Sequence, residues 1–180
     1  MASITLVTGG MASGKSRWAI SYFRTCDNVL YMNTSPALPE DTLHRLEFSN
    51  AENSVKWEIV NNVDDPISMM KDHKFFILDD LSGYVSTIMH KMIDHFDTVS
   101  KEELAKVRTT VVNNVIECMN RVVELNGAIV IITVEPGFSV VPLGSEQAAY
   151  RDIMGAVNQR IANTAQEVYL SVSGIQFKIK

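Results

Sequence analysis

Residues 9–16 read Gly-Gly-Met-Ala-Ser-Gly-Lys-Ser and fit the phosphate-loop pattern G-x-x-x-x-G-K-[ST]. In such a loop the glycines let successive backbone N–H groups point into one concavity, where the oxygens of β- and γ-phosphates bind. Lys15 adds a fixed positive charge, and the hydroxyl of Ser16 can bind Mg²⁺. The residues predicted to contact a nucleoside triphosphate are Gly9, Gly10, Met11, Ala12, Ser13, Gly14, Lys15 and Ser16.

Two adjacent carboxylates, Asp79 and Asp80, follow the apolar run at residues 75–78. A phosphate loop works with a carboxylate that holds Mg²⁺ through its water shell, at the carboxyl end of a neighbouring strand. Side chains of adjacent strand residues point to opposite faces, so one of the pair is expected to face the metal. We predict that Asp79, the first after the run, acts with Ser16 at the metal. The alternative is that both aspartates only end the strand.

A third carboxylate, Glu135, stands at the end of the most apolar run of the chain, residues 128–134. At the carboxyl end of the predicted strand it is a candidate catalytic residue, which would orient or deprotonate an attacking hydroxyl group. A purely structural carboxylate is the other interpretation, and the pattern alone does not separate the two.

Short apolar runs alternate with helical patterns along the chain. Strands are predicted at residues 4–8, 29–32, 57–60, 75–78, 128–134, 168–172 and 175–180. Helices are predicted at residues 16–23, 83–96, 101–126 and 146–165, while the polar stretch 37–56 is expected to be irregular, with one helical turn near 42–48. This alternation predicts the α/β class, a RecA-like P-loop domain with a mostly parallel sheet and helices on both faces. Residues 1–180 are predicted to form one such domain.

The composition narrows the classes of partner. Of the 180 residues, 46% are hydrophobic and 21% are charged, which excludes disordered and fibrous classes. The formal net charge of −5 predicts neither nucleic acid nor an anionic membrane as partner, and no apolar run reaches the roughly 18 residues that cross a bilayer. Two cysteines, Cys26 and Cys118, cannot form a disulfide framework and suit a reducing cytosol. We therefore expect a cytoplasmic protein.

The phosphate loop alone leaves several classes of nucleotide-binding protein open. The Asn-Lys-x-Asp tetrapeptide by which GTPases read the base is not in the sequence. Residues 81–84 read Leu-Ser-Gly-Tyr and do not continue into the Leu-Ser-Gly-Gly-Gln signature of transporter ATPases. Small-molecule kinases remain by elimination. The alternatives are a kinase or NTPase acting on another small metabolite, and a nucleotide-binding module without catalysis.

Further motifs narrow the choice among these classes of nucleotide-binding protein. Residues 6–17 contain Leu-Val-Thr-Gly-Gly and Ser-Gly-Lys-Ser-Arg, residues 151–159 fit R-D-x-x-G-x-x-N-Q, and residues 172–175 read Val-Ser-Gly-Ile. With these elements the chain resembles, nearly end to end, the bifunctional adenosylcobinamide kinase/adenosylcobinamide-phosphate guanylyltransferase family of cobalamin biosynthesis. The resemblance implies phosphorylation of a corrinoid, adenosylcobinamide, with GTP or ATP as donor and Mg²⁺ as cofactor. It also implies a homo-oligomer, a trimer, and adds Thr34 to the nucleotide contacts.

The sequence departs from the family pattern at one chemically decisive position. The family transfers GMP through a histidine placed three residues after the arginine that matches Arg45, and here that residue is Phe48. A phenyl ring has no nitrogen that could form a phosphoramidate, so the covalent step cannot occur at Phe48. His44 lies one helical turn from Phe48 and is the candidate replacement as guanylyl acceptor. The kinase half of the pattern is intact at the phosphate loop and at Asp79.

Overall fold

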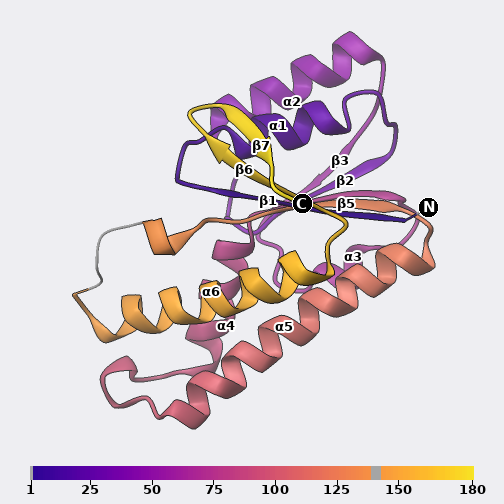
Figure 1. Cartoon of the computed structure of the whole chain (residues 1–180). Helices are drawn as coiled ribbons and strands as arrows, with labels where there is room; N and C mark the ends of the chain where they lie inside the picture. Colours follow the sequence, from indigo (N-terminus) through magenta and orange to yellow (C-terminus); the bar gives the residue numbers. More distant parts are fainter. Residues whose placement is uncertain (1, 139–142) are drawn as a thin grey trace.

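Seven strands form one sheet among the residues that the computed structural model describes, 2–138 and 143–180 (Figure 1). The strands are β1 (Ser3–Gly9), β2 (Val29–Asn33), β3 (Glu58–Val60), β4 (Phe75–Asp79), β5 (Ala128–Ile132), β6 (Glu167–Val172) and β7 (Ile175–Lys178). Their order across the sheet is β3-β2-β4-β5-β1-β6-β7, and every neighbouring pair is parallel except β6 and β7. The sheet confirms the predicted α/β class.

Alternating side chains of the strands pack into two cores, one on each face of the sheet. In β2, Leu30 and Met32 lie in the larger core, whereas Val29 and Tyr31 lie in the smaller one. The smaller core is covered by α1 (Lys15–Tyr22) and α2 (Glu40–Asn53), and the larger by α3 (Pro66–Met69), α4 (Leu81–Met92), α5 (Lys101–Glu124) and α6 (Ser145–Thr164) (Figure 1). Helices therefore cover both faces, as the sequence predicts.

Helix α2 corrects the prediction for residues 37–56, where the sequence pattern indicates a single helical turn. Fourteen residues are helical, and Leu46 is the one among them that is buried. The carboxylates of Glu40 and Asp41 in the first turn favour a helix start, because they face the positive end of the helix dipole. A helix that buries a single side chain carries almost no apolar periodicity, so the pattern underestimates its length.

Other element boundaries differ from the prediction by a few residues, and two of the differences affect the site. Helix α4 occupies residues 81–92 in place of 83–96, because Asp80 caps its first turn and residues 96–98 form a separate 3-10 turn, η1 (Phe96–Thr98). Strand β5 ends at Ile132, two residues early, and a second 3-10 turn, η2 (Pro136–Phe138), follows it. Among the described helices, none has both the length and the apolar character needed to cross a membrane.

Strand β5 lies between β1 and β4, which corrects the expectation that the aspartates end a strand next to the phosphate loop. Ile131 of β5 is in register with Leu6 of β1 on one side and with Leu78 of β4 on the other. Because these strands are parallel, their carboxyl ends meet at one edge of the sheet. The phosphate loop, the segment after β5 and the aspartates after β4 therefore share that edge.

Candidate nucleotide-binding site

The loop that follows β1 requires glycine near both of its ends. Gly9 and Gly14 have φ angles of 148° and 95°, a region that other residues rarely adopt. A Cβ at Gly9 would lie 2.3 Å from the carbonyl oxygen of Ser171. One at Gly14 would lie 3.1 Å from the Cα of Gly174. The loop is thus folded closely against β6 and the turn that follows it.

Lys15 is the first residue of α1, and it is buried against the loop. Its Nζ donates hydrogen bonds to the carbonyl oxygens of Gly9, at 3.1 Å, and Gly10, at 2.6 Å. Burial lowers the pKa of this ammonium group below its usual value, and the charges of Asp80 and Asp79 oppose the shift. The ammonium group therefore lies between the loop backbone and the carboxylates that follow β4.

Asp79 faces the phosphate loop from the end of β4. Its carboxylate accepts a hydrogen bond from the hydroxyl of Tyr31 and is also hydrogen-bonded with Ser16. Burial raises the pKa of Asp79 above its usual range, and the hydrogen bonds with Tyr31 and Ser16 offset only part of the rise. The structure thus brings together Lys15, Ser16 and Asp79, three residues that the sequence assigns to phosphate and metal.

Asp80 has different partners. Its carboxylate accepts the backbone N–H of Gly83 at 2.8 Å and the hydroxyl of Ser82 at 2.6 Å, and so caps α4. Thr34 is buried behind the aspartates: its hydroxyl donates to the Asp80 carbonyl at 2.9 Å, and its N–H donates to the Asp79 carbonyl at 2.9 Å. In this structure Thr34 holds the end of β4 in place, and it is not among the described residues that line the cavity over the loop.

Glu135 leaves the sheet after β5, and a clasp on α6 fixes the backbone just before it. The hydroxyl of Thr133 donates to Oδ1 of Asn158 at 2.8 Å, and Nδ2 of Asn158 donates to the carbonyl of Val134 at 2.8 Å. Asn158 and Thr133 are both buried. Asn158 belongs to the R-D-x-x-G-x-x-N-Q motif, but the motif does not indicate this role, because the partners of Asn158 are reached only through the tertiary fold.

A cavity of about 480 Å³ opens over the phosphate loop. It is lined by Ala12, Ser13, Gly14, Lys15, Ser16 and Arg17, by Asp41, Thr42 and Arg45 of α2, and by Ser173 and Gly174 of the turn between β6 and β7. Four predicted contacts lie outside this described lining: Thr34 is buried behind the aspartates, Gly9 and Gly10 accept hydrogen bonds from Lys15, and Met11 is exposed. The volume falls within the range of small-molecule sites.

Asp41 and Arg45 line the cavity although no motif points to Asp41. Nε and Nη2 of Arg45 donate to the two carboxylate oxygens of Asp41 at 2.9 and 3.0 Å. The hydrogen bonds from Arg45 hold the pKa of Asp41 below its usual value. Their i, i+4 spacing is the available sequence signal, and it indicates a helical pair without indicating which surface the pair faces.

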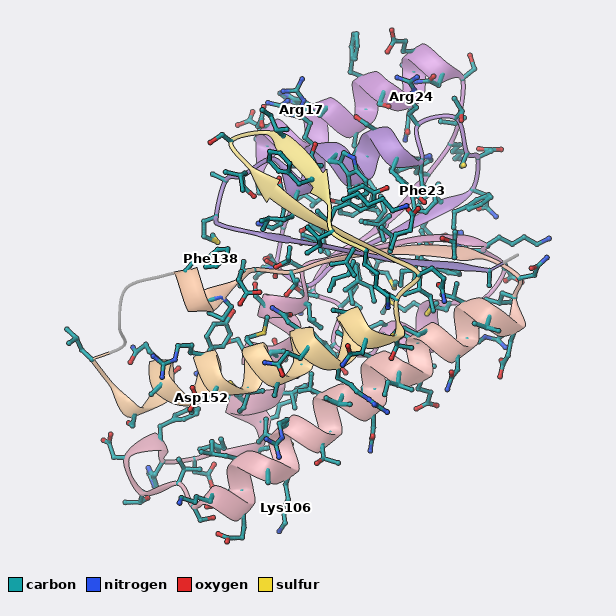
Figure 2. The ribbon with its side chains drawn as sticks, in the orientation of Figure 1. Arg17, Phe23, Arg24, Lys106, Phe138 and Asp152 are labelled. Atoms are coloured by element: carbon teal, nitrogen blue, oxygen red, sulfur yellow. The ribbon has the colours of Figure 1, made fainter. Side chains whose placement is uncertain are left out.

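A second cavity of about 300 Å³ continues from the first between α1 and α2, since Arg17 and Arg45 line both. Arg24 lines it as well, and Figure 2 shows Arg17 and Arg24 near opposite ends of α1. Arg45 is paired with Asp41, but the guanidinium groups of Arg17 and Arg24 outnumber Glu52, the carboxylate in the described lining, and so favour an anionic ligand, in contrast with the net negative charge of the chain. We refer to this cavity as the arginine groove.

Helix α2 places Phe48 and His44 one turn apart, but they differ in what they face. Phe48 lines the arginine groove and is 70% exposed. The His44 side chain is 68% exposed, with its Nε2 4.0 Å from the carboxylate of Glu40, and it lines neither the loop cavity nor the arginine groove. The described lining of both cavities therefore contains no imidazole.

Comparison with known proteins gives a consistent result over the full length. The family model described as cobinamide kinase / cobinamide phosphate guanyltransferase matches residues 5–179. The chain is 30% identical over 184 residues to the bifunctional adenosylcobalamin biosynthesis protein CobU of Escherichia coli K12, which covers 97% of this chain and 98% of that protein. The protein of the same name from Salmonella typhimurium LT2 is 31% identical over 180 residues, with the same coverage. The bifunctional adenosylcobalamin biosynthesis protein CobP of Pseudomonas aeruginosa PAO1 is 25% identical over 183 residues, covering 97% and 96%.

Proposed function

The chain belongs to the cobinamide kinase / cobinamide phosphate guanyltransferase family, and we propose that it transfers the γ-phosphoryl group of GTP or ATP to the alcohol of adenosylcobinamide. The reaction would serve cobalamin biosynthesis in the cytoplasm. The observation that carries the proposal is the buried carboxylate of Asp79 beside the hydroxyl of Ser16 and the ammonium group of Lys15. A loop that only bound phosphate would not require a carboxylate buried next to it.

Phosphoryl transfer of this kind depends on position and on charge. The oxygens that attack and leave lie roughly in line, and negative charge spreads over the transferred group. The N–H groups of the loop and the positive end of α1 would hold the phosphates. Lys15, which now donates to the carbonyls of Gly9 and Gly10, would exchange these partners for phosphate oxygens.

The residues beside the loop fit a magnesium ion. Mg²⁺ prefers oxygen ligands and keeps part of its water shell, and Ser16 and Asp79 supply a hydroxyl and a carboxylate side by side. Ser16 would bind the ion directly and Asp79 through water. The ion, when bound, neutralises charge on the phosphates.

Glu135 is our proposed partner for the acceptor alcohol. It emerges after β5, which lies between the strand of the phosphate loop and the strand of Asp79. A carboxylate at that position can accept the proton of a hydroxyl group that attacks the γ-phosphate. The Thr133–Asn158 clasp would hold Glu135 in position while the acceptor enters.

We propose further that this chain does not carry GMP covalently on α2. A phosphoramidate needs an imidazole nitrogen near the bound phosphates, and the residue of α2 that lines the arginine groove at this position is Phe48. His44 lines neither cavity, so it is not placed to replace the missing histidine. The activity that remains is the kinase.

The test is to incubate the purified protein with adenosylcobinamide, Mg²⁺ and either GTP or ATP, and to resolve the products by mass spectrometry. We expect the corrinoid to gain one phosphoryl group and no guanylyl group. Absence of any phosphorylated corrinoid with both donors would contradict the kinase assignment. A product that carries GMP would contradict the loss of the second activity.

A further inference from the structure

A cavity of about 360 Å³ lies between α4 and α6, on the face of the sheet opposite to α1 and α2 (Figure 1). Ser82, Ser86 and His90 of α4 line it on one side. Glu146, Gln147 and Tyr150 of α6 line it on the other. Because Ser82 and His90 are eight residues apart on one helix, the cavity runs along two turns of α4. We refer to it as the α4–α6 groove.

One end of the α4–α6 groove meets the carboxylates at the end of β4. The hydroxyl of Ser82 donates to the Asp80 carboxylate at 2.6 Å, and Tyr150 is hydrogen-bonded with Ser82. Asp80 follows Asp79 directly and lies close enough to Lys15 to act on the charge of its ammonium group. The inner end of the groove therefore lies at the carboxyl end of β4, on the edge of the sheet that also carries the phosphate loop.

The other end of the groove is closed by a pair that joins the two helices. Nε2 of His90 lies 3.0 Å from a carboxylate oxygen of Glu146, and its Nδ1 lies 2.8 Å from the carbonyl oxygen of Ser86. Both ring nitrogens are thus engaged within the protein. The pair joins α4 to α6 at this end of the groove.

The chemistry of this lining differs from that of the arginine groove. The described residues of the α4–α6 groove include hydroxyls, an amide and a carboxylate, but neither lysine nor arginine. A polyphosphate would meet the carboxylate of Glu146 there, and the imidazole of His90 already lies 3.0 Å from that carboxylate, so the described lining offers the phosphates no unpaired cation. An uncharged alcohol that carries carboxamide groups would find donors and acceptors of matching type.

We propose that the α4–α6 groove is the acceptor site, and that it binds the alcohol arm of the corrinoid with the hydroxyl group toward Ser82. The inference rests on the proposed kinase function. A volume of about 360 Å³ holds the arm and its neighbouring amides, while the corrin ring stays outside. The inner end of the groove, at Ser82 after β4, and the phosphate loop after β1 lie at the same edge of the parallel sheet, so an acceptor at Ser82 can approach the γ-phosphate from the side of β4.

The test compares corrinoid binding in variants that fill the groove. Gln147→Trp and Ser86→Trp each place an indole in the groove, at an exposed and a half-buried helix position. We expect equilibrium dialysis, read by the visible absorbance of adenosylcobinamide, to show a dissociation constant raised at least about tenfold in both. The KM for GTP should stay within about twofold. Thr109→Trp, an exposed position on α5 outside every described cavity, is the matched control and should bind the corrinoid like the unmodified protein.

The outcomes separate the acceptor site from the kinase function. If the unmodified protein phosphorylates the corrinoid and both folded tryptophan variants bind it with unchanged affinity, the acceptor site lies elsewhere and the kinase assignment stands. Thermal melting of each variant shows whether it is folded, and Gln147→Trp, at an exposed position, decides the matter if Ser86→Trp does not fold. If the unmodified protein neither binds nor phosphorylates the corrinoid, the function and the acceptor site are both wrong.

Discussion

The phosphate loop and helix α2 line the same cavity, but they are held in very different ways. The Ser13 carbonyl accepts the N–H of Gly174 at 2.9 Å and the hydroxyl of Ser171 at 2.7 Å, and Lys15 is buried. Helix α2 buries one side chain, Leu46, and turns exposed residues toward the cavity. Substitutions on α2 can therefore change chemistry without disturbing the core. The comparison agrees with our proposal that this chain keeps the kinase half of the family's active site while Phe48 stands in place of the nucleophile of the other half.

The largest effect is expected at the loop. Lys15→Ala removes the charge that would follow the migrating phosphoryl group, so kcat for corrinoid phosphorylation should fall by about 10³-fold or more. Lys106→Ala, an exposed lysine of α5 labelled in Figure 2, is the control and should change kcat little. If kcat of Lys15→Ala stays within a few-fold of that of the unmodified protein, the phosphate loop does not act in phosphoryl transfer as proposed.

The next largest effect should distinguish Asp79 from Asp80. Asp79→Asn should lower kcat about 100-fold, with partial recovery at high Mg²⁺ concentration, because an amide binds the hydrated ion less well than a carboxylate. Asp80→Asn keeps an oxygen that can accept the N–H of Gly83, so it preserves the cap of α4 and should act much less on kcat. Steady-state kinetics at several Mg²⁺ concentrations measure both. The reverse order would assign the metal to Asp80.

A smaller effect concerns stability. Because the pKa of Asp79 in the folded protein lies above its usual value, the contribution of this group to stability is complete below the unfolded pKa and is lost as pH rises through the folded pKa. Asp79→Asn should therefore raise the melting temperature by a few degrees at pH 7, and the gain should disappear near pH 4. Thermal melts at both pH values test this. A variant that is less stable at pH 7 would show that ionised Asp79 stabilises the fold.

The smallest effect is expected on α2. Incubation with labelled GTP should leave no acid-labile nucleotide on the protein, and Phe48→Ala should leave phosphorylation of the corrinoid nearly unchanged. Phe48→His is the direct comparison, since label that appears only in this variant would show that the missing imidazole alone prevents guanylyl transfer. Label on the unmodified protein that disappears in His44→Ala would instead make His44 the acceptor, and the contrast between loop and helix would fail.

The central strands β1, β2, β4 and β5 could be predicted because they are buried on both faces and so form continuous apolar runs. The phosphate loop could be predicted equally well, because its glycines are required by the local backbone conformation. The length of helix α2 could not be predicted, because Leu46 is its one buried residue and gives no apolar periodicity. The position of β5 between β1 and β4 could not be predicted either, because strand order depends on packing between segments that are distant in the sequence. The role of Asp41 in the cavity could not be predicted, because its spacing to Arg45 does not indicate that the pair faces the phosphate loop.

The hydrogen bonds that join Ser13 to Ser171 and Gly174 have a consequence for synthesis of the chain. They link the phosphate loop to residues made about 160 positions later. At a translation rate of about 5–20 residues per second, the loop waits roughly 10–30 s after it is made for the partners that support its backbone. Until then a nascent chain holds the complete phosphate motif without its finished shape. Nucleotide affinity should therefore arise late, when the hairpin of β6 and β7 has left the ribosome.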